Sequence, residues 1–513
     1  MFCRSSLIYG FLVSWAGAAL ELGLPFSDHA VLQADKALPV WGKAAPGAEV
    51  RVTLGNRTAQ TSASAEGFWQ VEFPPAMASA EGVELHVKAG DERELRKDLV
   101  FGEIWIATGQ SNMRWMLKDC ANGKEALASG EDSELRVLNF QGRLHPGGKK
   151  YSREFLADLN EGDYYESNGW QRASAESLRE FSGVGYFFAK RLRKELGVPV
   201  GVIHLAVGGS PMEAHIPKSA FRKDKHLSGL LREWWKNPNY PQWCRQRAAL
   251  NLSEWIKDPI AGRAPPHPFA PSFLWNAGVQ PLMPFPVKGV LWYQGESNAT
   301  IDGGRGAPVS KEVNRRKFEA LIGAWRRAWR DEELPVYYVQ LPGMNRNWPL
   351  FREMQLEVSE EVLGVGMVVT IDVGHSTNVH PNKKKPVGER LAGLALGKTY
   401  GKEIVCESPV VKGVKFDQHL GWVEFDQLVL TQGGEQVVGF DVAGKDRVFH
   451  PAMATVQRNK VALQSEAVKE VVALRYAWAN DPKANLTNKE GLPVSPFRSD
   501  DWDDYFKLLI EKE

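Results

Sequence analysis

The stretch that decides the fold is IWIATGQSNM, at residues 104–113. Its first four residues form a short apolar run of the kind that makes a buried strand. The turn that follows presents Ser111 just past the strand end. There its hydroxyl is exposed at the edge of a sheet, and its backbone N–H lies where an oxyanion would develop. An ordinary strand-to-helix turn capped by serine gives the same pattern, so the chemistry depends on other segments.

Apolar strands alternate with helical segments on the carboxyl side of this stretch. This alternation predicts an α/β fold with a doubly wound parallel sheet and helices on both of its faces. Ligands of such sheets bind beyond the carboxyl ends of the strands. The expected elements are a helix at 178–196, strands at 200–206 and 289–293, a helix at 313–329, strands at 335–341 and 366–372, and a helix at 386–399.

Regions rich in short strands flank the α/β segment on both sides. Alternating runs at 38–41, 49–54 and 68–73, separated by turn residues, predict a small β-sandwich. Strand-like runs return after residue 405 and predict a second β-domain with an irregular tail. The predicted organisation is a leader at 1–19, an N-terminal β-domain at 20–100, an α/β domain at 101–400 with long insertions at 116–175 and 210–270, and a C-terminal β-domain at 401–513.

The N-terminus has the pattern of a secretory signal peptide. Arg4 precedes an apolar run from Leu7 to Leu20 that ends among small residues. The run is too short for a membrane span, which needs roughly 20 apolar residues. A buried N-terminal strand or helix is the alternative. We expect export to the periplasm or the medium, with no membrane span after removal of the leader.

Composition narrows the partners without identifying one. The chain has 513 residues, and 63 basic against 62 acidic side chains argue against a polyanion such as nucleic acid as partner. The 18 tryptophans suit either sugar stacking or core packing. Cys120, Cys244 and Cys406 would remain after leader removal, with no zinc-like spacing, and their disulfide state stays open. So does the oligomeric state.

Two further polar segments follow predicted strands. Gly209 lies in a Gly-Gly-Ser sequence whose backbone amides can approach a ligand closely, so it is a candidate oxyanion donor. Gln294, Glu296 and Asn298 are packed into QGESN. Glu296 is a candidate to orient a histidine, and either amide is a candidate oxyanion donor. A plain turn and a helix start, respectively, are the alternatives.

His380 follows another strand, in the sequence NVHP. Histidine is the side chain best suited to act as a base near neutral pH. A lone histidine is more often structural, but this one shares its sheet edge with a serine, glycines and a carboxylate. The basic run at 383–385 that follows is interpreted as a solvated helix start.

The order of four blocks resembles the sialate O-acetylesterase family of SGNH hydrolases, which is related to acetylxylan esterases with a QGE block. The similarity also covers FSDHAVLQ and PVWG near the N-terminus and RYAW with its following tail, hence nearly the whole mature chain. The four blocks, in chain order, are GQSNM, GGSPMEA, WYQGESNA and NVHPNKKKPVGERLA.

The resemblance implies a serine esterase that removes acetyl groups from carbohydrate. Ser111 would be the nucleophile and His380 the general base and then acid. Gly209 would donate to the oxyanion, with Asn298 and Gln294 as further donors. An acetyl-enzyme would form and be hydrolysed without a metal or an organic cofactor.

One position departs from the pattern of many SGNH enzymes, which place an aspartate three residues before the histidine. Here that residue is Thr377, with Asn378 next to it. The orienting acid is then Glu296, or Asp372 at the end of the preceding strand, or the enzyme works with a dyad or is inactive. We expect the Glu296 carboxylate within roughly 2.6–3.2 Å of a His380 ring nitrogen.

Other functions remain open on the sequence alone. A non-catalytic carbohydrate-binding protein would keep the tryptophans but has no reason to keep a serine, a histidine and a carboxylate at strand ends. A lipase of this fold class would use the same serine and histidine with a long apolar acyl pocket. The acetylated substrate is a sialic acid, xylan, a pectic side chain or a sulfated algal glycan.

Overall fold

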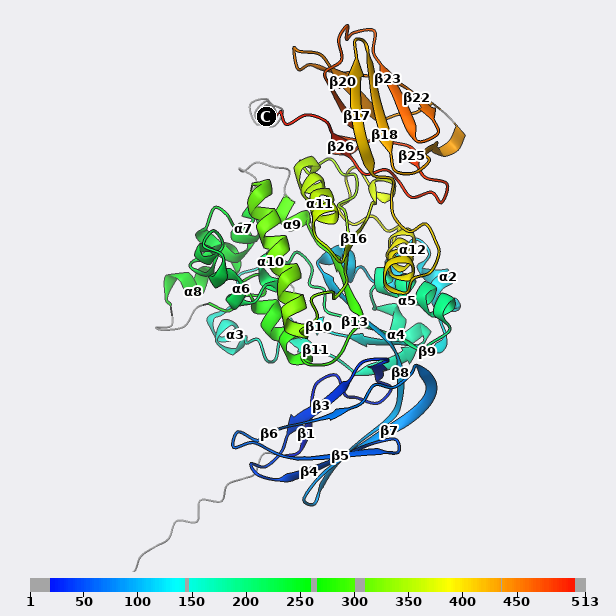
Figure 1. Ribbon diagram of the computed structural model, residues 1–513. Helices are drawn as coiled ribbons and strands as arrows, with labels where there is room; N and C mark the ends of the chain where they lie inside the picture. Colours follow the sequence, from blue (N-terminus) through cyan, green and yellow to red (C-terminus); the bar gives the residue numbers. More distant parts are fainter. Residues whose placement is uncertain (1–18, 144–146, 260–264, 300–309, 435, 503–513) are drawn as a thin grey trace, which may run out of the picture.

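The computed structural model shows an α/β part between two β-rich parts, arranged in a row (Figure 1). The expected mixed α/β class with extra β-rich domains is confirmed at this level. The expected leader lies almost wholly outside the described residues. The structure describes residues 19–143, 147–259, 265–299, 310–434 and 436–502.

The centre of the molecule is a six-stranded parallel sheet with an antiparallel strand at one edge. Its order is β12-β9-β13-β8-β14-β15-β16. The strands are β8 (Glu92–Gly109), β9 (Asp132–Asn139), β12 (Trp170–Ala173), β13 (Val200–His204), β14 (Gly289–Tyr293), β15 (Val336–Val339) and β16 (Val365–Val368).

Three of these strands depart from the sequence-based expectations. β9 and β12 fall inside the segment predicted to be an insertion, because β9 carries Asp132, Glu134 and Arg136 and only a short part of it is apolar. β8 is much longer than the run expected at 104–107. Its first part pairs with the N-terminal strands, and its last part lies in the central sheet, so one strand crosses the boundary predicted at residue 100 (Figure 1).

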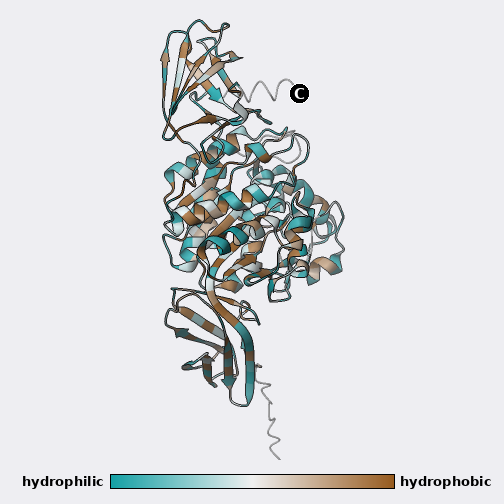
Figure 2. Ribbon diagram, turned by 90° about the vertical axis from the view of Figure 1, so that its right-hand side faces the viewer, coloured by the Kyte–Doolittle hydropathy of each residue, from teal (hydrophilic) through white to brown (hydrophobic). Residues whose placement is uncertain are grey.

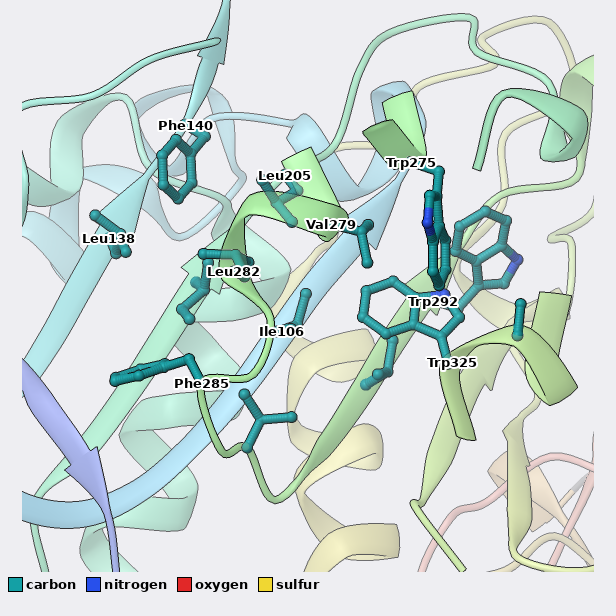
Figure 3. Close-up of a cluster of buried hydrophobic side chains, with 14 of the residues drawn as sticks. Ile106, Leu138, Phe140, Leu205, Trp275, Val279, Leu282, Phe285, Trp292 and Trp325 are labelled. Carbon is teal, nitrogen blue, oxygen red and sulfur yellow. The ribbon is translucent and has the colours of Figure 1, made fainter. Parts of the chain in front are cut away.

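Helices cover both faces of the sheet. Successive residues of a strand point to opposite faces, so neighbouring residues pack against different helices. Trp105 packs with α5 (Gly183–Leu196) and α12 (Lys385–Leu394), whereas Ile106 faces the side of α10 (Lys311–Trp329). Figure 3 shows this second side, where Ile106 lies in one cluster with tryptophans and Phe285. α11 (Pro349–Glu361) packs beside α10.

The first residues of α5 contact the turn that follows β8. The helix predicted at 178–196 is broken into α4 (Ala175–Arg179) and α5, because Ser182 caps α5 by accepting from the N–H of Gly185. The Ser182 hydroxyl also donates to the carbonyl of Met113 at 2.6 Å. This bond anchors the turn that follows β8.

The flanking parts are built of short strands that alternate exposed and buried residues, as the colours along the lower strands of Figure 2 show. Val50, Val52 and Leu54, for example, are buried at every second position. The N-terminal strands are β1 (Glu21–Leu22), β2 (Val31–Gln33), β3 (Leu38–Lys43), β4 (Glu49–Leu54), β5 (Arg57–Ser62), β6 (Phe68–Phe73) and β7 (Ser79–Ala89).

The C-terminal part packs two four-stranded sheets around its own core. One sheet contains β17 (Val411–Asp417), β18 (Leu420–Phe425), β22 (Met453–Gln457) and β23 (Lys460–Gln464). The other contains β20 (Phe440–Ala443), β21 (Phe449–Pro451), β24 (Ala473–Tyr476) and β26 (Phe497–Arg498), and β19 (Leu430–Thr431) pairs with β25 (Leu486–Thr487).

Short elements complete the central part. They are α1 (Ser111–Arg114), α2 (Gly123–Ala128), α3 (Arg153–Asp158), α6 (Lys218–Lys223), α7 (Gln242–Asn251), α8 (Ser253–Lys257), α9 (Glu296–Ala299) and the pair β10 (Gln141–Gly142) and β11 (Tyr165–Glu166). No helix in the described part of the chain is both long and apolar enough to cross a bilayer. No disulfide joins its three cysteines.

Candidate active site

Ser111 and His380 meet at the carboxyl edge of the central sheet. Ser111 begins α1 directly after β8, and its Oγ lies 2.8 Å from Nε2 of His380. The turn from β8 to Ser111 requires a glycine at position 109. Gly109 has φ +131°, and a Cβ there would lie 2.2 Å from the Tyr293 carbonyl oxygen. Both side chains are partly exposed, so a substrate can reach them.

The loop that carries His380 is held from several sides. The His380 N–H donates to Asn378 Oδ1 at 2.9 Å. Trp115 stacks on the imidazole with ring centroids 5.1 Å apart. The carbonyl of Val379 accepts a hydrogen bond from Asn112 Nδ2 at 2.9 Å, and Asn112 is the residue after Ser111. Two hydrogen bonds therefore join the serine turn to the histidine loop. One links the Ser111 and His380 side chains, and the other links the Asn112 side chain to the Val379 carbonyl.

Glu296 does not orient His380, so the distance expected from the sequence is wrong. Within the described residues, no hydrogen bond or ion pair joins the two side chains. Glu296 starts α9 beneath the serine turn and is fully buried, and its carboxylate accepts a hydrogen bond from Asn112 Nδ2 instead. Burial raises the pKa of Glu296, and the Asn112 bond opposes that rise.

Asp372, the rival acid, is also directed elsewhere. Both of its carboxylate oxygens accept from the Arg390 guanidinium of α12, at 2.7 and 2.6 Å. Asp372 therefore ties the strand end to that helix. Thr377 donates its backbone N–H to His375 Nδ1. Neither Asp372 nor Thr377 hydrogen bonds to the His380 ring among the contacts of the described residues.

Gly209 lies in a tight loop beside the serine turn, and its role as an oxyanion donor stays a prediction. Its φ is +73°, and a Cβ would lie 2.6 Å from the Trp243 ring. Its loop is tied to the serine turn, because the Val207 N–H donates to the Gly109 carbonyl at 3.1 Å. No acceptor in the described ranges takes the Gly209 N–H. Ser111 adds an N–H at the first position of α1, where no intrahelical acceptor exists.

Gln294 and Asn298 face away from this position. Gln294 donates both amide hydrogens, one to the Ser210 carbonyl at 3.3 Å and one to Asn298 Oδ1 at 2.7 Å. Asn298 donates to Glu213 Oε2 at 3.0 Å and accepts from the Met212 N–H. The expected oxyanion role is wrong for Gln294, whose donors are used. Asn298 is engaged as a brace of the Gly209 loop, and its oxyanion role stays a prediction.

A buried ion pair, which sequence reasoning missed, closes this brace. Lys317 and Glu213 are both fully buried, with Nζ and Oε1 2.6 Å apart. Lys317 also donates to the Asn239 carbonyl at 2.8 Å. Lys317 lies on α10 three residues after Asn314 and four before Leu321, both buried, so its helical position was the available signal.

Lys384 is the second residue that sequence reasoning placed wrongly. The run at 383–385 was interpreted as solvated, yet Lys384 is 1% exposed while both of its neighbours are exposed. Its Nζ donates to Asn112 Oδ1. The signal was again periodicity, because position 384 shares a helical face with the buried Val387, Gly388 and Leu391 of α12.

The chemistry open to this arrangement is acyl transfer by a serine. A histidine that accepts from a serine hydroxyl can take its proton, and the backbone N–H groups of Ser111 and Gly209 are candidates to stabilise an oxyanion. Where the structure describes the chain, no group of three His, Cys, Asp or Glu side chains is placed to hold a metal ion.

Known proteins share both the sequence and the architecture. The family described as "Carbohydrate esterase, sialic acid-specific acetylesterase" matches residues 274–397. Human sialate O-acetylesterase is 26% identical over 523 residues, which cover 92% of this chain and 90% of that protein. The mouse enzyme is 26% identical over 537 residues, with 94% of each chain covered.

A solved structure extends the similarity to nearly the full length. A carbohydrate acetylesterase from Xanthomonas citri is 33% identical, with a TM-score of 0.75, and the match covers 94% of this chain and 100% of that one. Its coverage includes both β-rich parts as well as the central sheet. The chain belongs to the sialate O-acetylesterase family and is a carboxylic ester hydrolase.

Proposed function

We propose that this protein removes O-acetyl groups from carbohydrate through an acetyl-enzyme on Ser111. The observation that carries the proposal is the 2.8 Å contact between Ser111 Oγ and His380 Nε2 at the sheet edge. Partial exposure of both side chains supports it. The parallel strand order around β8 supports an SGNH-type, doubly wound arrangement. The apolar leader supports export to the periplasm or the medium.

The first half of the reaction forms the acetyl-enzyme. With its ring proton on Nδ1, His380 accepts the Ser111 proton at Nε2 while Oγ attacks the acetyl carbonyl carbon. The N–H groups of Ser111 and Gly209 stabilise the oxyanion. The tetrahedral intermediate collapses, the bond to the sugar oxygen breaks, and His380 returns the proton to that oxygen.

The second half releases acetate. A water molecule gives a proton to His380 Nε2 and attacks the acetyl carbonyl of the ester on Ser111. The new tetrahedral intermediate collapses, acetate leaves and the proton returns to the serine oxygen. Every proton movement in these steps uses His380, so the orientation of its ring decides the rate.

The names of the relatives suggest the leaving group. The curated relatives act on sialate O-acetyl groups by name, and the Xanthomonas protein is named a carbohydrate acetylesterase. We therefore propose an acetylated sugar, with sialate first and xylan or another plant or algal glycan as alternatives of the same mechanism.

The test is acetate release from a panel of glycans. O-acetylated sialic acid, acetylated xylan, an acetylated pectic fragment and an acetylated algal glycan are compared at equal acetyl concentration. Acetate release from at least one of them, lost in Ser111→Ala, supports the proposal. Faster hydrolysis of octanoyl than of acetyl aryl esters, with no glycan deacetylated, would contradict it.

A further inference from the structure

A buried lysine lies next to the nucleophile but takes no part in the steps above. The ammonium of Lys384 donates to Asn112 Oδ1. It also lies over two aromatic faces, 5.9 Å from the Trp115 ring centroid and 5.4 Å from that of Tyr293. Burying a cation is costly unless it is paired, so a retained cation at this place calls for a function.

Asn112 separates this cation from a buried anion. Its Oδ1 accepts from Lys384, and its Nδ2 donates to Glu296 and to the Val379 carbonyl. A donor at one end of the amide and two acceptors at the other allow only one of its two orientations. Lys384 and Glu296 together therefore fix which way the Asn112 side chain points.

The amide connects directly to both reacting residues. Asn112 follows Ser111 in α1, and Val379 precedes His380 in the loop. The hydrogen bond from Asn112 to Val379 therefore holds the histidine loop against the serine turn. A flipped amide would point its oxygen at the Val379 carbonyl, and the repulsion would push the two segments apart.

We propose that Lys384 is a positioning residue for ester hydrolysis, acting through the Asn112 amide to hold His380 against Ser111. This inference rests on the proposed function, since it assigns a role to Lys384 in the same site.

The groups around Lys384 agree with this role. Glu296, Cys120 and Tyr293 are the titratable side chains that face it from α9, from the segment after α1 and from β14. Burial lowers the pKa of Lys384 to about 7, and the Glu296 charge opposes that change. Burial raises the pKa of Cys120 to about 12, so this thiol stays neutral. A neutral amine keeps its N–H donors, so the bond to Asn112 persists when the proton leaves.

The first experiment replaces Lys384 by the apolar Met and uses its exposed neighbour as control. Lys384→Met removes the donor at similar length, and Lys383→Met removes a charge one residue away. We expect kcat on an aryl acetate to fall about 100-fold in Lys384→Met, with KM changed by less than about threefold, because misplacement of a reacting group has that effect. Lys383→Met should match the wild type within about twofold.

A double-mutant cycle separates positioning from general damage. If Lys384 acts through Asn112, adding Lys384→Met to Asn112→Ala lowers kcat by less than about threefold further. The rate at which a fluorophosphonate labels Ser111 should follow kcat through the cycle, since it reports nucleophile activation without the sugar. Should Lys384→Met not fold, Lys384→Gln enters the same cycle.

The outcomes distinguish this inference from the function on which it rests. Activity retained in Ser111→Ala would overturn the proposed function. With Ser111→Ala inactive, two results would overturn the role of Lys384 alone: a Lys384→Met variant as active as Lys383→Met, or additive effects of Lys384→Met and Asn112→Ala.

Discussion

Among the residues that the structure describes, two serine–histidine pairs lie at the same edge of the sheet, and they differ in access. Ser111 and His380 are 2.8 Å apart and partly exposed. Ser210 and His215 are 2.9 Å apart, but they are 0% and 1% exposed. Burial lowers the pKa of His215 to about 3. A serine–histidine hydrogen bond is thus not evidence of catalysis by itself, and access decides which pair an ester can reach.

Two buried lysine–glutamate pairs repeat the contrast. Lys317 and Glu213 touch directly, and their bonds hold the Gly209 loop. Lys384 and Glu296 are separated by an amide that also contacts the histidine loop. The direct pair braces the structure, whereas the separated pair transmits its geometry to the reacting residues.

Replacing the serine of each serine–histidine pair should give the largest difference in activity between the two pairs. Ser111→Ala should lower kcat/KM on an aryl acetate by at least about 10⁴-fold, because losing a nucleophile removes the covalent route. Ser210→Ala should stay within about tenfold, since its hydroxyl only bonds inside the protein. The check is to measure kcat/KM of both variants at a temperature at which each is shown to be folded. Equal losses in both variants would remove the distinction between the pairs.

Replacing each lysine should separate stability from activity. Lys317→Met leaves Glu213 buried without its partner and should lower the free energy of unfolding by about 3–5 kcal/mol. Lys384→Met should cost at least about 2 kcal/mol less, because burial raises the pKa of Glu296 and lets it take up a proton. Denaturant unfolding measures both values. The reverse order of stabilities would contradict the assignment of brace and positioning device.

A Cβ at Gly209 should sharpen the oxyanion assignment. Gly209→Ala strains a backbone at φ +73° and meets the Trp243 ring, so the N–H shifts and kcat should fall by about tenfold or more. Gly47→Ala is the matched control. Gly47 has a φ of +76° with nothing within 4 Å of a Cβ, and it lies far from the site. A kcat loss of the same size in both variants would show that backbone strain alone is responsible.

Acid should destabilise the protein through its buried histidines. Burial lowers the pKa of His204, His215 and His267 to about 3 each. Between about pH 6.5 and pH 3 the unfolded chain binds protons that the folded chain does not, so stability is lost as the pH falls through this window. Each histidine contributes about 1.4 kcal/mol per pH unit. His215→Gln should make the slope shallower by that amount, and an unchanged slope would contradict the burial account.

Strand ends were the readable part of the site. Ser111, Gly209 and His380 each follow a strand of one parallel sheet, so their approach to one edge followed from the alternation of elements. The direction of Glu296 could not be read in this way. It starts a short helix, and whether its carboxylate reaches the histidine loop or Asn112 depends on packing that no sequence period encodes.

The strands at the edge of the sheet and the buried lysines were harder to predict from the sequence, for different reasons. β9 contains three charged residues, Asp132, Glu134 and Arg136, and has too few apolar residues to stand out from an insertion. Lys384 was assigned to solvent because of its charge, although its spacing from Val387, Gly388 and Leu391 placed it on the buried face of α12. Periodicity was the better guide there, and composition the worse one.

The most direct test of the account is where the acetyl group goes during turnover. The enzyme is mixed with an acetyl ester, quenched in acid within the first turnovers and digested for mass spectrometry. The account predicts an acetyl group on the peptide that contains Ser111, absent in Ser111→Ala. Full activity with no acetylated peptide, or the acetyl group on Ser210, would contradict it.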